Sequence, residues 1–398
     1  MNAMRTVLRW GIGGAPEAPA ALRRGVRRSI LRWVSLLVVG LGGARAAAPA
    51  PREPAGGVLF YEGYTFRDNT EAVANPHILG PFFQLYWSEI ERQPGEFDWS
   101  DWDRRLQPWL AAGKKYALRI MWCSSGNWPL PAAKTPTPAW VWADGARCVR
   151  YEKSPVEIPL FWDPVYQRYA RRFLLEVARK FDADPRLLFI DVTPGAETNP
   201  YRFRVINAWS PEFRERYAAT PASDGRTYTD ALWLETVLAS IDASAEVFVR
   251  TPRLVTLNVG GLNGDRLAEI GAHAVRSGCY VGQNGLSPAS LPEGSRRRQL
   301  FDGWARQTRL FFEMVDATGE TLNSLLAKWG KPPVPVRPGA ERNTATLLDY
   351  VRAAERLQCS YLNVYAEDVI KGTKGTATYD PAWEEALRHG AAALGRKR

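Results

Sequence analysis

The sequence predicts an α/β protein whose main domain is a closed (β/α)8 TIM barrel with long loops on the C-terminal face. Short apolar, β-branched runs recur along the 398 residues, and most of them are followed by a segment with helical periodicity. The runs lie at residues 58–61, 82–86, 116–122, 187–193, 254–259, 279–283, 310–313 and 360–365. Eight such strands favour a closed barrel over an open doubly wound sheet, which would need a phosphate- or cofactor-binding turn that the sequence lacks.

Helix start signals separate several of these strands. Asp163 supplies a capping carboxylate and Pro164 suits the first turn, and apolar residues then follow at helical spacing as far as Phe181. The same pair recurs at Asp380 and Pro381. Further helix starts are expected at Ser100, at Asn263 or Asp265, and at Asn343 or Thr344.

The basic charge is concentrated at the N-terminus. The formal net charge is +10, of which residues 1–46 contribute +7 through eight arginines and one acid, Glu17. An apolar stretch at 33–43 and small residues at 44–46 complete a pattern typical of a cleavable export signal. We therefore expect an export signal at 1–46 and a linker at 47–56, followed by one barrel domain at 57–398.

The predicted location is exported, either periplasmic or secreted. Arg27 and Arg28 resemble a twin-arginine motif, which gives that export route a modest preference over general secretion. An uncleaved membrane anchor is the alternative for the apolar stretch. Since the remaining chain carries a net charge of only +3, no nucleic-acid partner is expected.

Metal and cofactor chemistry has no support in the sequence. The three histidines, His77, His273 and His389, lack the spacing of a zinc site, and no glycine-rich phosphate loop follows a strand. We predict no cofactor and no metal, and the oligomeric state is left open. Cys123 and Cys148 flank one loop and are expected to form a disulfide in an oxidising compartment.

Carboxylate, amide and aromatic residues collect where the predicted strands end. Active sites of barrels lie at these C-terminal strand ends, where Glu197 follows the fourth strand and Glu313 ends the seventh. The other candidates, for substrate binding, are Trp87, Trp122, Asn127, Trp128, Asn199, Asn258, Gln283, Asn284, Tyr365 and Glu367. Amides and carboxylates bind hydroxyl groups and aromatic rings stack on sugar C–H faces, so the set predicts a carbohydrate site.

Two alternatives stay open within this set. For any single tryptophan of the long connections, residues 123–161 and 198–229, we favour packing of the loop onto the barrel, an explanation that weakens for the set as a whole. Arg119 and Asp191, in the middle of neighbouring strands, form either a structural ion pair beneath the site or a pair that orients catalytic groups. We favour the structural role for that pair.

The segment after the second strand resembles clan A retaining glycoside hydrolases, especially family 42 and 35 β-galactosidases and family 39 relatives. The residues concerned are Trp87, Glu91, Pro94, Gly95, Phe97, Asp98, Trp99 and Asp103, continued by 113–119 and by Trp162, Asp163, Pro164 and Tyr166. The resemblance runs from residue 82 to 197. It implies that Glu197 is the acid/base and Glu313 the nucleophile. Glu367, from the neighbouring eighth strand, is the alternative nucleophile.

One residue departs from the pattern of the clan. An asparagine usually precedes the acid/base glutamate, whereas Ala196 precedes Glu197 here, and Asn199 is a possible substitute. The resemblance implies an exported retaining glycoside hydrolase that cleaves β-linked oligo- or polysaccharide with two glutamates. The alternative is a catalytically silent glycan-binding barrel involved in polysaccharide handling or export. A metal- or phosphate-dependent aldolase or isomerase barrel is disfavoured by the missing ligand motifs.

Overall fold

The computed structural model describes residues 56–63, 66–122, 136–150, 157–195, 198, 211–257, 264–318 and 345–396. The chain separates into two compact units, residues 1–50 and 51–398, and all described residues belong to the second. The predicted export signal therefore lies outside the described residues. Within the described ranges, no helix is long and apolar enough to cross a membrane.

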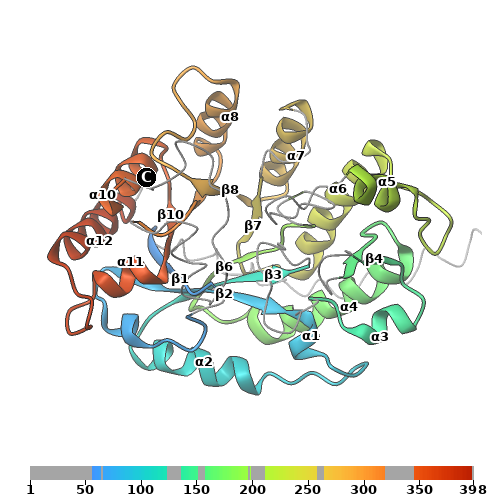
Figure 1. Cartoon of the computed structure of the whole chain (residues 1–398), viewed down its shortest axis with the longest axis horizontal. Helices are drawn as coiled ribbons and strands as arrows, with labels where there is room; N and C mark the ends of the chain where they lie inside the picture. The colour runs from blue at the N-terminus through green and yellow to red at the C-terminus, as the bar shows by residue number, and fades with distance from the viewer. Residues whose placement is uncertain are drawn as a thin grey trace, which may run out of the picture. The chain divides into compact units, whose positions relative to one another are not determined.

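Eight parallel strands close into a barrel, so the fold is a (β/α)8 TIM barrel and all eight predicted strands are confirmed (Figure 1). Around the barrel the strands follow the order β1, β2, β3, β6, β7, β8, β9, β10 and back to β1. Their bounds are Gly57–Tyr61, Ile78–Tyr86, Tyr116–Met121, Leu187–Asp191, Arg253–Thr256, Tyr280–Leu286, Leu310–Met314 and Tyr361–Tyr365.

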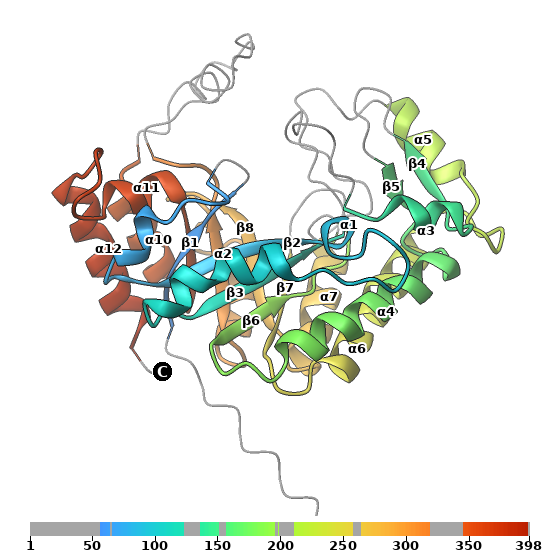
Figure 2. The same cartoon turned by 90° about the horizontal axis from the view of Figure 1, so that it is seen from below.

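Helices cover the outside of the barrel, and Figures 1 and 2 both place α10, α11 and α12 on the opposite side from α3, α5 and β4. The helices of the first half are η1 Glu71–Ala74, α1 Trp87–Ile90, α2 Ser100–Ala111, α3 Ala139–Ala143, α4 Pro164–Phe181, α5 Pro211–Ala219 and α6 Asp230–Val247. Those of the second half are α7 Gly264–Arg276, α8 Arg296–Ala305, α10 Leu347–Arg356, α11 Ala366–Lys371 and α12 Pro381–Leu394.

Two of the predicted helix caps are confirmed and two are wrong. Asp163 accepts hydrogen bonds from the first turn of α4, and Asp380 does the same for α12. Ser100 is itself the first residue of α2, because Asp98 accepts from its backbone N–H. Thr346, rather than Asn343 or Thr344, caps α10 through a capping box with Asp349.

Side chains alternate between the two faces of each strand, so inward-pointing residues are two positions apart. In the described strands they form two layers of the barrel interior. The lower layer is apolar and contains Leu59, Phe82, Ala117, Leu188, Phe189, Leu254, Phe311 and Tyr361. Phe311 lies 5.3 Å from Phe82 and 5.7 Å from Phe189 between ring centroids. Gly282 makes room for it, since a Cβ there would lie 2.7 Å from the Phe311 carbonyl oxygen. This aromatic floor supports the polar layer above it.

The two long connections contain secondary structure and contact each other. Strands β4 (Cys148–Arg150) and β5 (Glu157–Pro159) form an antiparallel pair within the connection after β3. Tyr217 of α5, in the connection after β6, is fully buried and donates a hydrogen bond of 2.8 Å to the Pro159 carbonyl. The described parts of both connections are therefore packed segments.

The predicted disulfide stays a prediction, because one of its two cysteines lies outside the described residues. Cys148 carries a free thiol, and Cys123 lies outside the described residues. Burial raises the pKa of the Cys148 thiol to about 12. Cys279 is also free and buried, as expected for a thiol that packs as a small apolar side chain. Cys359 is buried too, and its Sγ donates to the Tyr361 carbonyl at 2.9 Å.

Candidate active site

The polar layer of the barrel is centred on Arg119 of β3. Its guanidinium donates from Nε to Asp191 Oδ2 at 2.7 Å, from Nη1 to Glu313 Oε2 at 2.9 Å and from Nη2 to Asn284 Oδ1 at 3.0 Å. All four residues are at most 8 % exposed. One arginine therefore connects strands β3, β6, β8 and β9 across the barrel.

Glu313 is the predicted nucleophile, and two donors hold one of its oxygens. Asn363 Nδ2 of β10 donates to Oε2 at 3.0 Å, in addition to Arg119 Nη1 at 2.9 Å. Strand register explains this arrangement, because Glu313 pairs with Asn284 on β8 and with Asn363 on β10. The three side chains therefore share one level of the barrel and one face of the sheet.

Electrostatics favour a charged pair at this level. Burial alone would lower the pKa of Arg119, but the carboxylates of Glu313 and Asp191 raise it above its usual value. The guanidinium also lies 4.6 Å from the centroid of the Phe82 ring, which supplies a cation–π contact from below. A permanent cation 2.9 Å from Glu313 in turn favours the carboxylate form, which a nucleophile requires.

A second hydrogen-bonded chain lies on β1 and β2. Gln84 Nε2 donates to the Tyr61 hydroxyl at 2.9 Å, and the Tyr86 hydroxyl donates to Gln84 Oε1 at 3.1 Å. The Tyr61 ring meets Tyr365 edge-on at 5.2 Å between centroids. This places the predicted binding residue Tyr365 beside the polar layer, at the end of β10.

The turn after β6 is strained next to the predicted acid/base. Thr198 has φ of 64°, and its N–H donates to the Pro194 carbonyl at 3.1 Å. A β-branched residue in this left-handed region is unusual, and such strain clusters at functional sites. Trp233 Nε1 of α6 donates to the Thr198 carbonyl at 3.0 Å and helps to hold the turn.

Five of the predicted site residues lie outside the described residues: Asn127, Trp128, Glu197, Asn199 and Asn258. Their roles stay predictions. Of the others, Glu313 and Asn284 come together on Arg119, and Tyr365 lies nearby through Tyr61.

Trp87 and Trp122 do not face the barrel mouth. Trp87 is fully buried and stacks on Phe173 of α4 at 5.2 Å, and Trp122 meets both rings edge-on. Trp87 Nε1 donates to Glu91 at 2.7 Å, and Glu91 also accepts from Gly95 N and Arg172. In the described structure the faces of these two rings pack α4 on the barrel, so their role in substrate binding stays a prediction.

Gln283 and Glu367 also lie elsewhere than predicted. Gln283 pairs in register with Phe312, whose ring packs on Phe301 of α8, so it lies on the helix-facing side of β8. Glu367 was expected to continue the alternation of β10, but α11 begins at Ala366 and the alternation ends there. Its neighbour Asp368 is fully buried.

Gln84 and Asn363 of the polar layer were not among the predicted site residues, and Arg119 was expected to have a structural role. All three side chains lie on the inward face of their strands. Gln84 is two positions from the inward residue Phe82, Arg119 two from Ala117 and Asn363 two from Tyr361. Alternation could have found them, because a polar residue at an inward position of a barrel strand has few structural reasons to be there. Arg119 and Asp191 do form the predicted ion pair.

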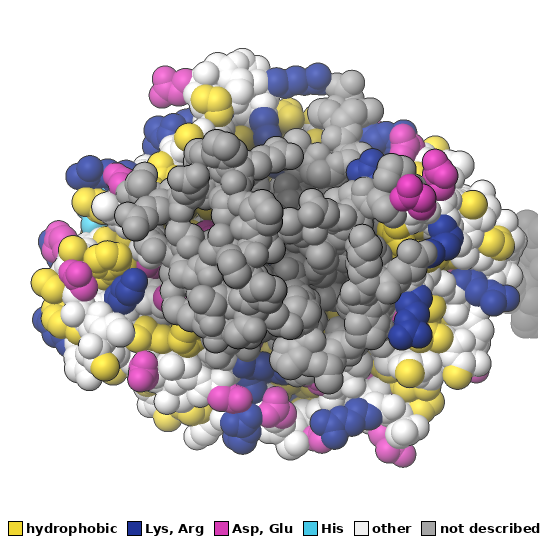
Figure 3. All heavy atoms as spheres, in the orientation of Figure 1, with side chains coloured by type: hydrophobic (Ala, Val, Ile, Leu, Met, Phe, Trp, Pro, Cys, Tyr) yellow, Lys and Arg dark blue, Asp and Glu magenta, His cyan; other side chains and the backbone are white. Residues whose placement is uncertain are grey.

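Neither the surface charge pattern nor a metal-ligand cluster marks a further site among the described residues. Figure 3 shows basic and acidic side chains interspersed around the described periphery of this face. In the part of the chain that the structure describes, no three His, Cys, Asp or Glu residues are grouped as metal ligands.

Comparisons with known proteins place the chain by its fold. No family model matches the sequence, and no curated protein matches it. The catalytic domain of β-amylase from Paenibacillus polymyxa aligns with a TM-score of 0.51 at 10 % identity, over 85 % of this chain and 99 % of that domain. The chain therefore has the (β/α)8 fold of that domain.

Two further solved structures align less closely. β-Galactosidase from the psychrophilic Marinomonas ef1 has a TM-score of 0.46 at 14 % identity, over 83 % of this chain and 58 % of that one. A glycosylated endo-β-1,4-xylanase of glycoside hydrolase family 10 from Gloeophyllum trabeum has a TM-score of 0.46 at 11 % identity, over 85 % and 96 % of the two chains.

Proposed function

We propose that this protein is an exported retaining glycoside hydrolase that cleaves β-linked oligo- or polysaccharide, with Glu313 as nucleophile and Glu197 as acid/base. The observation that carries the proposal is the buried Glu313 carboxylate, held by Arg119 and Asn363 at the C-terminal end of β9. The fold shared with a β-amylase catalytic domain agrees with carbohydrate as the substrate class.

The chemistry follows from the two carboxyl groups. Glu313 attacks the anomeric carbon and forms a glycosyl ester, while Glu197 protonates the leaving oxygen; Glu197 then deprotonates the water that hydrolyses the ester. Arg119 opposes protonation of Glu313 before the attack, and Asn363 fixes the direction of its Oε2. Retention requires the two carboxyl groups to lie roughly 5 to 5.5 Å apart.

Hydrolysis of defined β-linked oligosaccharides and aryl β-glycosides tests the proposal. Glu313→Gln should remove turnover of every substrate that the wild-type protein cleaves. Glu197→Ala should slow oligosaccharides far more than aryl glycosides with activated leaving groups, because the latter need little protonation. NMR of the first product should show retained β configuration; inverted product would contradict the assignment of Glu313 as nucleophile.

The second candidate is a catalytically silent glycan-binding barrel. It is favoured by Ala196, which replaces the asparagine that usually precedes the acid/base glutamate in the clan that the sequence resembles. Saccharide binding without turnover of any substrate in the panel would select this candidate over the hydrolase.

A further inference from the structure

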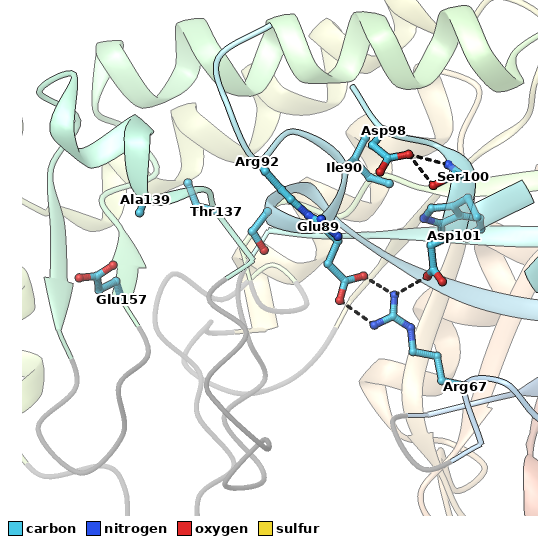
Figure 4. Close-up of a pocket in the computed structure, with 12 residues that line it drawn as sticks. Arg67, Glu89, Ile90, Arg92, Asp98, Ser100, Asp101, Thr137, Ala139 and Glu157 are labelled. Atoms are coloured by element: carbon cyan, nitrogen blue, oxygen red, sulfur yellow. Dashed lines mark hydrogen bonds and ion pairs between the residues drawn. The ribbon is translucent and has the colours of Figure 1, made fainter. Parts of the chain in front are cut away.

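A separate pocket of about 590 Å3 lies beside the loop that follows β2 (Figure 4). It is lined by Arg67, α1, the loop after α1, the start of α2, the segment before α3, and Glu157 of β5. None of the residues that line it belongs to the polar layer around Glu313. The volume is in the range of sites for small molecules.

A rigid ion-pair cluster forms one wall of this pocket. Arg67 Nη1 donates to Glu89 Oε1 at 2.6 Å, Nη2 bonds to Glu89 Oε2, and Nη2 lies 3.8 Å from Asp101 Oδ2. The fork of the guanidinium is thus fixed in one orientation, as Figure 4 shows. A wall of this kind presents carboxylate oxygens in set positions to a ligand that offers hydroxyl or ammonium groups.

Other groups of the pocket have no partner in the described structure. Arg92 and Glu157 both line it, and neither forms an ion pair or hydrogen bond through its side chain with a described residue. Ile90 and Trp102, which are 2 % and 1 % exposed, supply the apolar part. The Trp102 indole Nε1 is a buried donor without a hydrogen-bond partner.

Charge decides which ligand fits. Four carboxylates line the pocket (Glu89, Asp98, Asp101 and Glu157), against two guanidinium groups (Arg67 and Arg92). This balance disfavours phosphates and sugar acids, whereas mixed donors and acceptors beside an apolar floor suit a polyhydroxyl ring. We infer that the pocket is a second carbohydrate-binding site, which takes a neutral or amino sugar unit away from the reacting centre. The inference rests on the proposed function only in taking carbohydrate as the ligand class.

Calorimetric titration of the full-length Glu313→Gln protein tests this inference, because that substitution keeps saccharides from being consumed. The probes are β-1,4-linked hexasaccharides of glucose, glucosamine and mannuronate. Arg92→Ala with Glu157→Ala removes the free charges, and Ala139→Trp fills the pocket without removing a charge. Each should weaken binding of the glucose or glucosamine hexasaccharide at least tenfold. Matched controls, Arg306→Ala with Glu293→Ala, remove exposed charges near α8 and should bind as the parent protein does.

Three results would overturn the inference: pocket variants that bind every saccharide as the controls do, an effect confined to mannuronate, or no binding of any probe by the parent protein. Failure of the proposed hydrolase function looks different. In that case the wild-type protein cleaves nothing in the panel, while pocket-dependent binding persists.

Discussion

The Arg119 side chain binds the carboxylates of Glu313 and Asp191 at once. It lies between the two carboxylates and also bonds to Asn284, so each of its three bonding nitrogen atoms has a different partner. A lysine carries the same charge on a single nitrogen and cannot reproduce this planar fork.

Arg119→Lys should therefore damage both catalysis and stability. We expect kcat to fall roughly 100-fold, because orientation of Glu313 is lost, and the free energy of unfolding to fall by about 2 to 3 kcal/mol, because buried acceptors lose their donors. Kinetics on an aryl glycoside and urea unfolding measure the two effects. Arg186→Lys, in an exposed pair with Asp184, is the control and should change neither by much.

If Arg119→Lys lowers the free energy of unfolding but leaves kcat unchanged, the role of Arg119 is structural only. Loss of kcat with unchanged binding of saccharide would instead support its role in positioning the nucleophile.

At the level of elements, Asp163 joins the start of α4 to both long connections. Its Oδ1 accepts from Val165 N at 2.8 Å and Tyr166 N at 3.1 Å, which caps the helix. Its Oδ2 accepts from Ser223 N at 2.7 Å and Arg147 N at 3.3 Å. Asp380 has the same Asp-Pro sequence but is more exposed, and its side chain accepts only from Ala382 N among the described residues.

Comparing Asp163→Ala with Asp380→Ala measures how much the additional hydrogen bonds of Asp163 contribute to stability. Loss of an ordinary cap costs about 1 kcal/mol, which is what we expect for Asp380→Ala. Asp163→Ala should cost roughly 3 to 4 kcal/mol, because it also removes the acceptor of the part-buried hydrogen bonds from Ser223 N and Arg147 N. Urea unfolding of both variants measures the difference; equal losses would mean that the contacts to Ser223 and Arg147 contribute nothing to stability.

Across the whole molecule, Glu62 makes stability depend on pH. It follows β1, is 1 % exposed, bonds to Arg105 of α2 and accepts from Gln84 N at 3.3 Å. Burial raises its pKa from 4.5 to about 7, although Arg105 acts in the opposite direction. Since the folded state holds this proton more tightly, the stabilisation is full below pH 4.5 and is lost as the pH rises through 7.

Raising the pH from 5 to 8 ionises Glu62 in the folded state and should therefore lower the free energy of unfolding by about 3 kcal/mol. Asp368 shifts in the same direction, so the relevant quantity is the difference between wild type and Glu62→Gln at each pH. Urea unfolding at pH 5, 6, 7 and 8 should show a steeper decline for the wild type. Parallel pH profiles would mean that Arg105 keeps Glu62 ionised throughout.

Sequence patterns alone determined the eight strands, the closed barrel and the position of Glu313 at a strand end. Hydrophobic runs and helix signals are local, and each depends on residues a few positions apart. The Asp163–Pro164 and Asp380–Pro381 caps were predicted correctly for the same reason. Ser100 was misjudged because Asp98, two residues earlier, competes for the helix start.

Only the tertiary structure decided which of the candidates share a site. Trp87 and Trp122 have the residue type of sugar-binding rings, but burial against α4 depends on a helix more than 40 residues away. Gln283 and Asn284 are neighbours in sequence, and strand register sends them to opposite faces of β8. The bonds from Arg119 to Glu313 and Asn284 join residues up to 194 positions apart. Such contacts follow from closure of the barrel, which no local pattern encodes.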